Sequence, residues 1–297
     1  MAQMEVYMRR LLVLAMFIPA TLLASRYGGG HNHLSVTTDD SNVRSCGDVR
    51  VTIDDEPAAR AEEVVNVGNP RSLAIHAARN GGIYVSGSDS GRYEVTACKA
   101  AAVGASLNDI RVSNSGNEIG ADGPASDRWV VYFIVRAPRG ADLNLDANNG
   151  PISVRDVNGT ITARAVNGPI SARELDGTIN LETTNGPISI EGSSGTAKLN
   201  ATNGPITVKL RGDSWNGTLD AHTENGPMSL RISPNFRSSV VVESDGHGPV
   251  SCRSDACKQA RRTWDDTDNR RIEFGSGPMA VHLSTNNGPV SVKGIEE

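Results

Sequence analysis

The chain has 297 residues, of which 31 are glycine and only 4% are aromatic, and its formal net charge is −5 at pH 7. So few bulky side chains exclude an ordinary α/β enzyme core, while 38% hydrophobic and 21% charged residues exclude a disordered tail or a membrane channel. The net negative charge argues against nucleic-acid binding, because the phosphate backbone requires a clustered positive surface.

Residues 1–24 predict a signal peptide. Arg9 and Arg10 precede the apolar stretch 11–24, which is too short to span a bilayer that needs about 20 apolar residues. The small residue Ala24 suits the position before a cleavage site. The alternative is an uncleaved anchor, and it would be the chain's only contact with a membrane. We expect an exported protein that is periplasmic, displayed on the cell surface or secreted.

The chain after the signal divides into two regions. Residues 25–63 form an N-terminal polar segment, and residues 64–297 form one domain. Within that domain we expect an excursion at 104–127, which is rich in Gly, Ser, Asn and Asp, and a cysteine-bearing insertion at 251–271. The continuous apolar run 129–135 predicts a strand that is buried on both faces.

The middle of the chain is a repeat. Asn149-Gly150-Pro151 recurs at intervals of 18 residues, and Asn-Gly-Thr or Asp-Gly-Thr sequences lie halfway between, so the unit is nine residues. Fixed-period self-similarity of this kind predicts a solenoid. We expect corner turns, with glycine in the left-handed conformation that is accessible to it, at Asn149, Gly150, Asn158, Gly159, Asn167, Gly168, Asp176, Gly177, Asn185, Gly186, Asn203, Gly204, Asn225 and Gly226.

Asn-Gly also favours two-residue hairpins, so an antiparallel meander is the competing fold. The third position of each unit is almost always Ile and the fifth is Val, Leu, Ile or Ala, whereas the seventh is mixed. Parallel stacking places like positions together and forms continuous aliphatic ladders, which a meander does not. The sequence therefore predicts an all-β fold: a single-stranded parallel β-solenoid (β-helix) with about 18 residues per coil in two nine-residue halves.

The four cysteines allow three pairings. Cys252 and Cys257 enclose only four residues, so we expect them to pair, which leaves Cys46 with Cys98. Zinc binding by the C-x4-C spacing is the alternative, but export favours oxidation and no second Cys or His pair lies near.

One stretch carries a family resemblance. Residues 135–145 (VRAPRGADLNL) run directly into Asn149-Gly150-Pro151-Ile152-Ser153-Val154, and residues 80–85 (NGGIYV) form a similar opening unit. The chain resembles the bacterial "putative adhesin" family of unknown function, whose members carry repeated N-G-x-I-x-V units behind a signal peptide. The resemblance covers roughly residues 64–297. It implies a β-solenoid in a bacterial envelope with an adhesive or scaffolding role.

Candidate chemistry is sparse. Asp156 and Glu174 lie 18 residues apart and could stack as an acid–base pair on neighbouring coils, although such acids are usually solvent-facing corner residues. His31 and His33 could bind a metal, and Asp265-Asp266-Thr267-Asp268 resembles the start of a calcium loop, but solvated loops are the better interpretation. Arg211-Gly212-Asp213 matches a cell-adhesion tripeptide, which often arises by chance. We expect no catalytic, cofactor-binding or metal-binding residues.

We therefore expect a non-enzymatic exported protein that presents a repetitive polar face for adhesion or binding at the cell envelope. The ligand is a glycan, a cell-wall polymer or a protein, and not a nucleic acid. Alternatives are a periplasmic envelope-stress or signalling accessory and a scaffold that assembles end to end through an uncapped coil. The terminal residues 293–297 look like a cap and disfavour the scaffold. A polysaccharide-active β-helix enzyme is the remote alternative.

Overall fold

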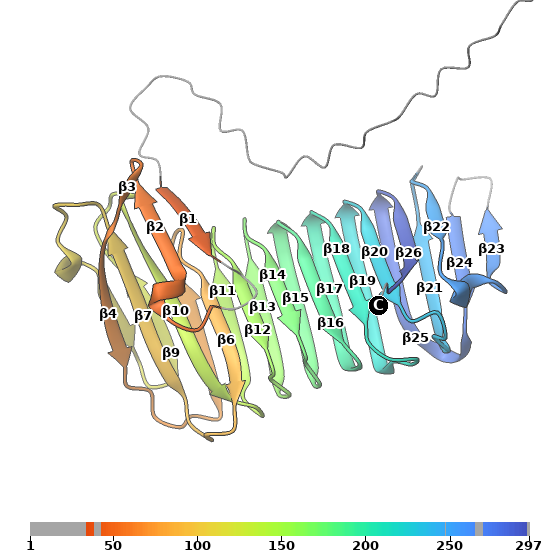
Figure 1. Cartoon of the computed structure of the whole chain (residues 1–297), viewed down its shortest axis with the longest axis horizontal. Helices are drawn as coiled ribbons and strands as arrows, with labels where there is room; N and C mark the ends of the chain where they lie inside the picture. The colour runs from red at the N-terminus through yellow and green to blue at the C-terminus, as the bar shows by residue number, and fades with distance from the viewer. Residues whose placement is uncertain (1–33, 39–42, 247, 265–269, 296–297) are drawn as a thin grey trace, which may run out of the picture. The chain divides into compact units, whose positions relative to one another are not determined.

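The computed structural model describes residues 34–38, 43–246, 248–264 and 270–295. These residues form an all-β structure, as expected, with one three-stranded sheet and two large sheets of eleven and twelve strands (Figure 1). Helical structure among them is limited to the short 3-10 turns η1 (Cys46–Asp48), η2 (Leu107–Asp109) and η3 (Asp255–Cys257). None of the helices found there is long and apolar enough to cross a membrane.

Successive strands of the repeat alternate between the two large sheets. The twelve-stranded sheet contains β5 (Ser72–Ala77), β11 (Asp142–Ala147), β13 (Thr160–Ala165), β15 (Thr178–Asn185), β17 (Ser194–Asn203), β19 (Asn216–Asn225) and β25 (Ser276–Asn287). The eleven-stranded sheet contains β6 (Ile83–Ser88), β12 (Ile152–Arg155), β14 (Ile170–Arg173), β16 (Ile188–Gly192), β18 (Ile206–Leu210), β20 (Met228–Ile232) and β26 (Val290–Gly294). Each of these strands pairs in parallel with its neighbours in the repeat.

The register of these parallel pairs follows the repeat. Ile152 lies beside Ile170, Ile170 beside Ile188, and Ile188 beside Ile206. All four side chains are buried, and one hydrophobic cluster joins the inward residues of both large sheets. Burying an Ile side chain contributes roughly 1.5–3 kcal/mol, so the isoleucine ladder is a principal source of stability.

The glycine corners have a different physical origin from the one we expected. None of the seven glycines that we expected at corners has a positive φ. Two glycines outside that set, Gly195 and Gly217, do have positive φ angles, of 116° and 126°. The corner glycines are instead required by close stacking. A Cβ added at Gly168 would lie 2.1 Å from the Gly150 carbonyl oxygen, and one at Gly186 would lie 2.3 Å from that of Gly168.

The sheets are mixed, not purely parallel as the repeat suggested. β7 (Glu94–Ala101) pairs antiparallel with both β4 (Ala59–Val65) and β10 (Trp129–Pro138), and β10 pairs in parallel with β6. β8 (Arg111–Asn114) and β9 (Glu118–Asp122) pair antiparallel at the edge of the twelve-stranded sheet. These segments lack the Asn-Gly period, so nothing in them enforces a parallel return. The predicted buried strand 129–135 is the first part of β10 and is buried throughout.

The last strand pair of the chain does not lie at the end of the sheets. β21 (Ser238–Ser244) and β22 (Val250–Cys252) pair in parallel with β25 and β26, so β25 and β26 lie between them and the earlier β19 and β20 (Figure 1). β24 (Arg270–Phe274) and β23 (Arg261–Trp264) then extend the twelve-stranded sheet antiparallel. The expected cap at residues 293–297 is therefore wrong for residues 293–295, while 296–297 lie outside the described residues.

The N-terminal polar segment contributes its own sheet of β1 (Leu34–Thr38), β2 (Val49–Ile53) and β3 (Glu56–Pro57). Val49, Val51 and Ile53 of β2 belong to a second hydrophobic cluster with Tyr84 and Tyr132 of the eleven-stranded sheet. Both disulfides that we expected are present, with Cα–Cα distances of 5.4 Å for Cys46–Cys98 and 6.2 Å for Cys252–Cys257. The first one ties η1 to β7.

Candidate functional site

The outward side chains of the eleven-stranded sheet form regular rows, because inward and outward positions alternate along each strand. One row consists of small hydroxyl residues on seven adjacent strands. We call it the hydroxyl row: Ser153, Ser171, Ser189, Thr207, Ser229, Ser291 and Ser251, each in register with the next. All seven side chains are partly exposed.

Two residues further along each strand lies a second outward row. Its members in register are Arg155, Arg173, Glu191, Lys209, Arg231 and Lys293. The backbone N–H of Arg253 donates to the Val292 carbonyl at 2.9 Å, which extends the β22–β26 ladder to Arg253. We call the six cations the basic row: Arg155, Arg173, Lys209, Arg231, Lys293 and Arg253.

The one acid in this line is neutralised locally. Glu191 contacts Lys209 and Arg211, each at 2.8 Å, and Arg211 also contacts Glu174 at 2.9 Å. Burial opposes ionisation of Glu191, but the hydrogen bonds from Lys209 and Arg211 outweigh it and lower the pKa of Glu191. By contrast, within the described part of the chain no ion pair or side-chain hydrogen bond engages Arg173, Arg231, Lys293 or Arg253.

The outer face of the twelve-stranded sheet has a different charge pattern. Asp146, Arg164 and Glu182 are adjacent in register, so their signs alternate from strand to strand. Arg164 pairs with Glu182 at 3.5 Å, and His76 contacts Asp146 at 3.2 Å. Arg164 and its acidic neighbours on this face therefore compensate one another.

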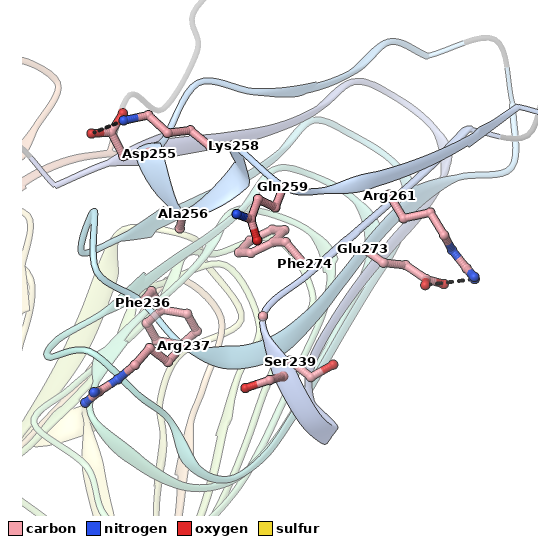
Figure 2. A pocket seen from close by; sticks show the side chains of 12 residues that line it. Phe236, Arg237, Ser239, Asp255, Ala256, Lys258, Gln259, Arg261, Glu273 and Phe274 are labelled. Carbon is pink, nitrogen blue, oxygen red and sulfur yellow. Dashed lines mark ion pairs between the residues drawn. The ribbon is translucent and has the colours of Figure 1, made fainter.

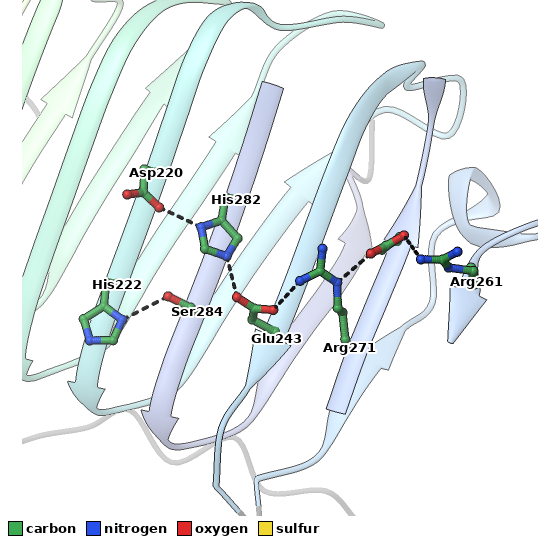
Figure 3. Close-up of polar contacts among 8 residues, drawn as sticks. Asp220, His222, Glu243, Arg261, Arg271, His282 and Ser284 are labelled. Carbon is green, nitrogen blue, oxygen red and sulfur yellow. Dashed lines mark hydrogen bonds and ion pairs between the residues drawn. The ribbon is translucent and has the colours of Figure 1, made fainter. Parts of the chain in front are cut away.

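The same compensation continues at the far end of that face (Figure 3). His282 Nδ1 lies 2.8 Å from Asp220 and its Nε2 lies 2.6 Å from Glu243, which also contacts Arg271 at 2.9 Å. The hydrogen bond with Glu243 outweighs burial and, together with Asp220, raises the pKa of His282. In turn the hydrogen bond from His282 lowers the pKa of Glu243. Arg271 also contacts Glu273 at 2.5 Å.

A pocket of about 730 Å³ lies between η3 and the ends of β21 and β24. Figure 2 shows the rings of Phe236 and Phe274 among its lining residues. Its charged rim is largely self-paired, since Lys258 contacts Asp255 at 3.3 Å and Arg261 contacts Glu273 at 3.0 Å.

The structure places the two candidate acids in ion pairs with arginines. Asp156 lies 3.7 Å from Arg139, and Glu174 lies 2.9 Å from Arg211. Both acids have positive φ angles, 59° and 53°, at the ends of β12 and β14. Two equivalent strand ends thus share the same left-handed backbone conformation.

The other motifs have these positions. In Arg211-Gly212-Asp213, Arg211 contacts the two glutamates described above and Asp213 accepts a 2.6 Å hydrogen bond from Ser233, so both charged groups have partners within the chain. His31, His33 and residues 265–268 lie outside the described residues. Across the described ranges, no group of three or more His, Cys, Asp or Glu side chains is arranged to hold a metal ion.

Part of the basic row was visible in the sequence. Arg155, Arg173 and Lys209 recur at the same outward position of the 18-residue period. Arg231 follows a four-residue insertion, and Lys293 and Arg253 join the row only because β26 and β22 are placed beside β20 in that order.

No family model and no curated protein matches the chain. Among solved structures it is similar to a "putative adhesin" from Bacteroides fragilis, at 12% identity and a TM-score of 0.38, over 80% of this chain and 97% of that one. It is also similar to a "putative cell adhesion protein" from Clostridium sporogenes (9% identity, TM-score 0.32, 80% and 99% coverage). A third similar structure is a "putative lipid binding protein" from Parabacteroides distasonis, at 8% identity and a TM-score of 0.36, over 79% of this chain and 97% of that one. TM-scores this low assign no function.

Proposed function

We propose that the chain is an exported, non-enzymatic binding protein of the bacterial cell envelope, with an adhesin-like role. In this proposal the repeat forms a parallel β-solenoid of about 18 residues per coil, and its outer faces bind a glycan, a cell-wall polymer or a protein. The in-register pairs between residues 18 apart and the alternation of strands between two sheets support the solenoid.

The observation that carries the binding role is the hydroxyl row, which repeats one small polar group across seven adjacent strands. A rigid sheet that offers the same group at regular spacing fits a ligand that also repeats. Export is supported by the two disulfides, since disulfides persist in oxidising compartments outside the cytosol.

The scaffold alternative is less well supported, because the edge strands of both large sheets are short or charged. β22 has three residues, β8 and β23 have four each, and β4 carries Arg60, Glu62 and Glu63. Such edges discourage the addition of another strand from a second molecule.

Protease treatment of intact cells tests the proposal, with immunodetection of this protein and of a periplasmic control. Surface display predicts that the protein is removed while the control survives. If the protein is protected until the envelope is opened, adhesion to other surfaces is untenable and a periplasmic accessory role takes its place.

A further inference from the structure

We propose that the basic row and the hydroxyl row together form a docking surface for a linear acidic polysaccharide. This inference rests on the proposed binding role and names the class of ligand that the eleven-stranded sheet takes.

The first argument is the uncompensated charge. Arg231 lies beside Lys293, so two cations without an ion-pair partner among the described residues stand directly opposite each other across neighbouring strands. Like charges in such cross-strand pairs destabilise a sheet. On the twelve-stranded sheet of the same molecule, opposite charges alternate and pair instead. An external anion would relieve the repulsion on the eleven-stranded sheet.

The second argument is the spacing. Neighbouring strands lie about 4.8 Å apart, so the basic row presents a cation at nearly every such step, interrupted at Glu191. A linear polymer of acidic sugars presents carboxylates at regular intervals along a stiff chain. The cations can therefore engage several of its carboxylates at once, and the attachment is multivalent.

The third argument is the hydroxyl row, which runs parallel to the cations on the same face. Each Ser or Thr hydroxyl both donates and accepts hydrogen bonds, as the hydroxyls of a sugar do. Single-stranded nucleic acid is bound instead on aromatic side chains, and neither row contains one. The net charge of −5 also disfavours a nucleic-acid duplex.

Two triple variants of the full chain test the surface with the same change in net charge. The first carries Arg173→Gln, Arg231→Gln and Lys293→Gln in the basic row. The control carries Arg111→Gln, Arg164→Gln and Lys198→Gln, three exposed cations of the twelve-stranded sheet. A cooperative thermal unfolding transition is the check that each variant is folded. The probes are polygalacturonate, the neutral polysaccharide dextran, and a DNA duplex.

We expect the basic-row variant to bind polygalacturonate about tenfold more weakly than the unmodified chain, because three exposed ion pairs are lost, and the control to bind it as the unmodified chain does. Dextran should bind neither variant. Equal losses in the two variants overturn the proposal, as does equal binding of dextran and polygalacturonate by the unmodified chain, or tighter binding of the DNA duplex than of polygalacturonate.

A salt titration of the unmodified chain keeps the test decisive if the variant fails to fold. Affinity for polygalacturonate should fall steadily as salt rises, because multivalent ion pairs release counterions on binding. A salt-independent affinity overturns the docking surface. If the chain adheres to isolated envelopes but polygalacturonate neither binds it nor competes, the ligand class is wrong while the binding role stands.

Discussion

Nδ2 of Asn167 donates a 2.8 Å hydrogen bond to Oδ1 of Asn149, one 18-residue repeat earlier in the chain. The same contact joins every neighbouring pair in a ladder of asparagines along one corner, at distances of 2.8–3.1 Å: Asn80, Asn149, Asn167, Asn185, Asn203, Asn225 and Asn287. The Asn80–Asn149 and Asn225–Asn287 contacts bridge 69 and 62 residues of sequence, so the ladder continues where a long stretch of chain separates two neighbouring asparagines. Chained amide hydrogen bonds polarise and strengthen one another.

Removing a central rung of the asparagine ladder should cost measurable stability. Asn185 donates to Asn167 and accepts from Asn203, so Asn185→Ala loses two hydrogen bonds, and we expect a cost of about 1–2 kcal/mol in the free energy of unfolding. The control is Asn158→Ala at the other kind of corner, where the side chain makes no hydrogen bond to a described residue. Chemical denaturation measures both, and equal costs would show that the ladder adds nothing.

Adding one methyl group at a stacked corner should destabilise the protein. In Gly186→Ala the new Cβ would lie 2.3 Å from the Gly168 carbonyl oxygen, so the backbone has to shift, at a cost of about 1–3 kcal/mol. Gly140→Ala is the matched control, because no atom of a residue other than Gly140 and its two chain neighbours lies within 4 Å of the Cβ position, and the φ of Gly140 is not positive. A lower thermal midpoint for the first variant alone is the expected result.

The His282–Glu243 contact should make stability depend on pH. The pKa of His282 is raised above 6.5, so its contribution is fully present below pH 6.5 and is lost as pH rises through the folded-state pKa. The pKa of Glu243 is lowered below 4.5, so its contribution is present above pH 4.5 and is lost as pH falls through the folded-state pKa. Both contributions are complete between pH 4.5 and 6.5.

His282→Gln should remove the part of the pH dependence that lies above pH 6.5. We expect the thermal midpoint of the unmodified protein to fall from pH 6.5 upward more steeply than that of the variant. His222→Gln serves as the control, because the contact of His222 is the Ser284 hydroxyl at 2.9 Å and not a carboxylate. Parallel pH profiles for the unmodified chain and His282→Gln would contradict the prediction.

The two disulfides should differ in what they contribute. Cys46–Cys98 closes a loop with a sequence separation of 52, so its replacement by a pair of alanines should cost about 4 kcal/mol on loop entropy. Cys252–Cys257 has a separation of 5, and its loss should cost about 2 kcal/mol. Denaturant titration of the two double-alanine variants checks the order, and a larger cost for the shorter loop would reverse it.

A core substitution near the C-terminus should be as costly as one in the middle of the chain. Leu283 is fully buried on β25, which has parallel partners on both sides. Leu283→Ala should therefore cost about 2–5 kcal/mol, close to the cost of Leu199→Ala on β17, another fully buried leucine. A cost near zero would indicate that the last strands fray as chain ends commonly do.

The repeat made much of the central region predictable. Asn-Gly every nine residues and Ile at the third position are local signals, and they predicted the strand positions, the inward residues and the parallel register of like positions. The same signals gave the wrong reason for glycine. The clash at Gly168 involves the carbonyl of Gly150, a contact that exists only once the two repeats are stacked.

The sequence by itself therefore determined the all-β class, the 18-residue period, the inward aliphatic positions and two chemically plausible disulfides, because each depends on local spacing or composition. The tertiary structure decided what depends on partners distant in sequence. It placed β25 between β19 and β21 and β26 between β20 and β22, and it paired the strands at the ends of the sheets antiparallel. It also brought Lys293 beside Arg231, and Arg253 beside Lys293. No local period specifies which strand a returning segment joins, since that choice is made by burial and hydrogen bonding across tens of residues.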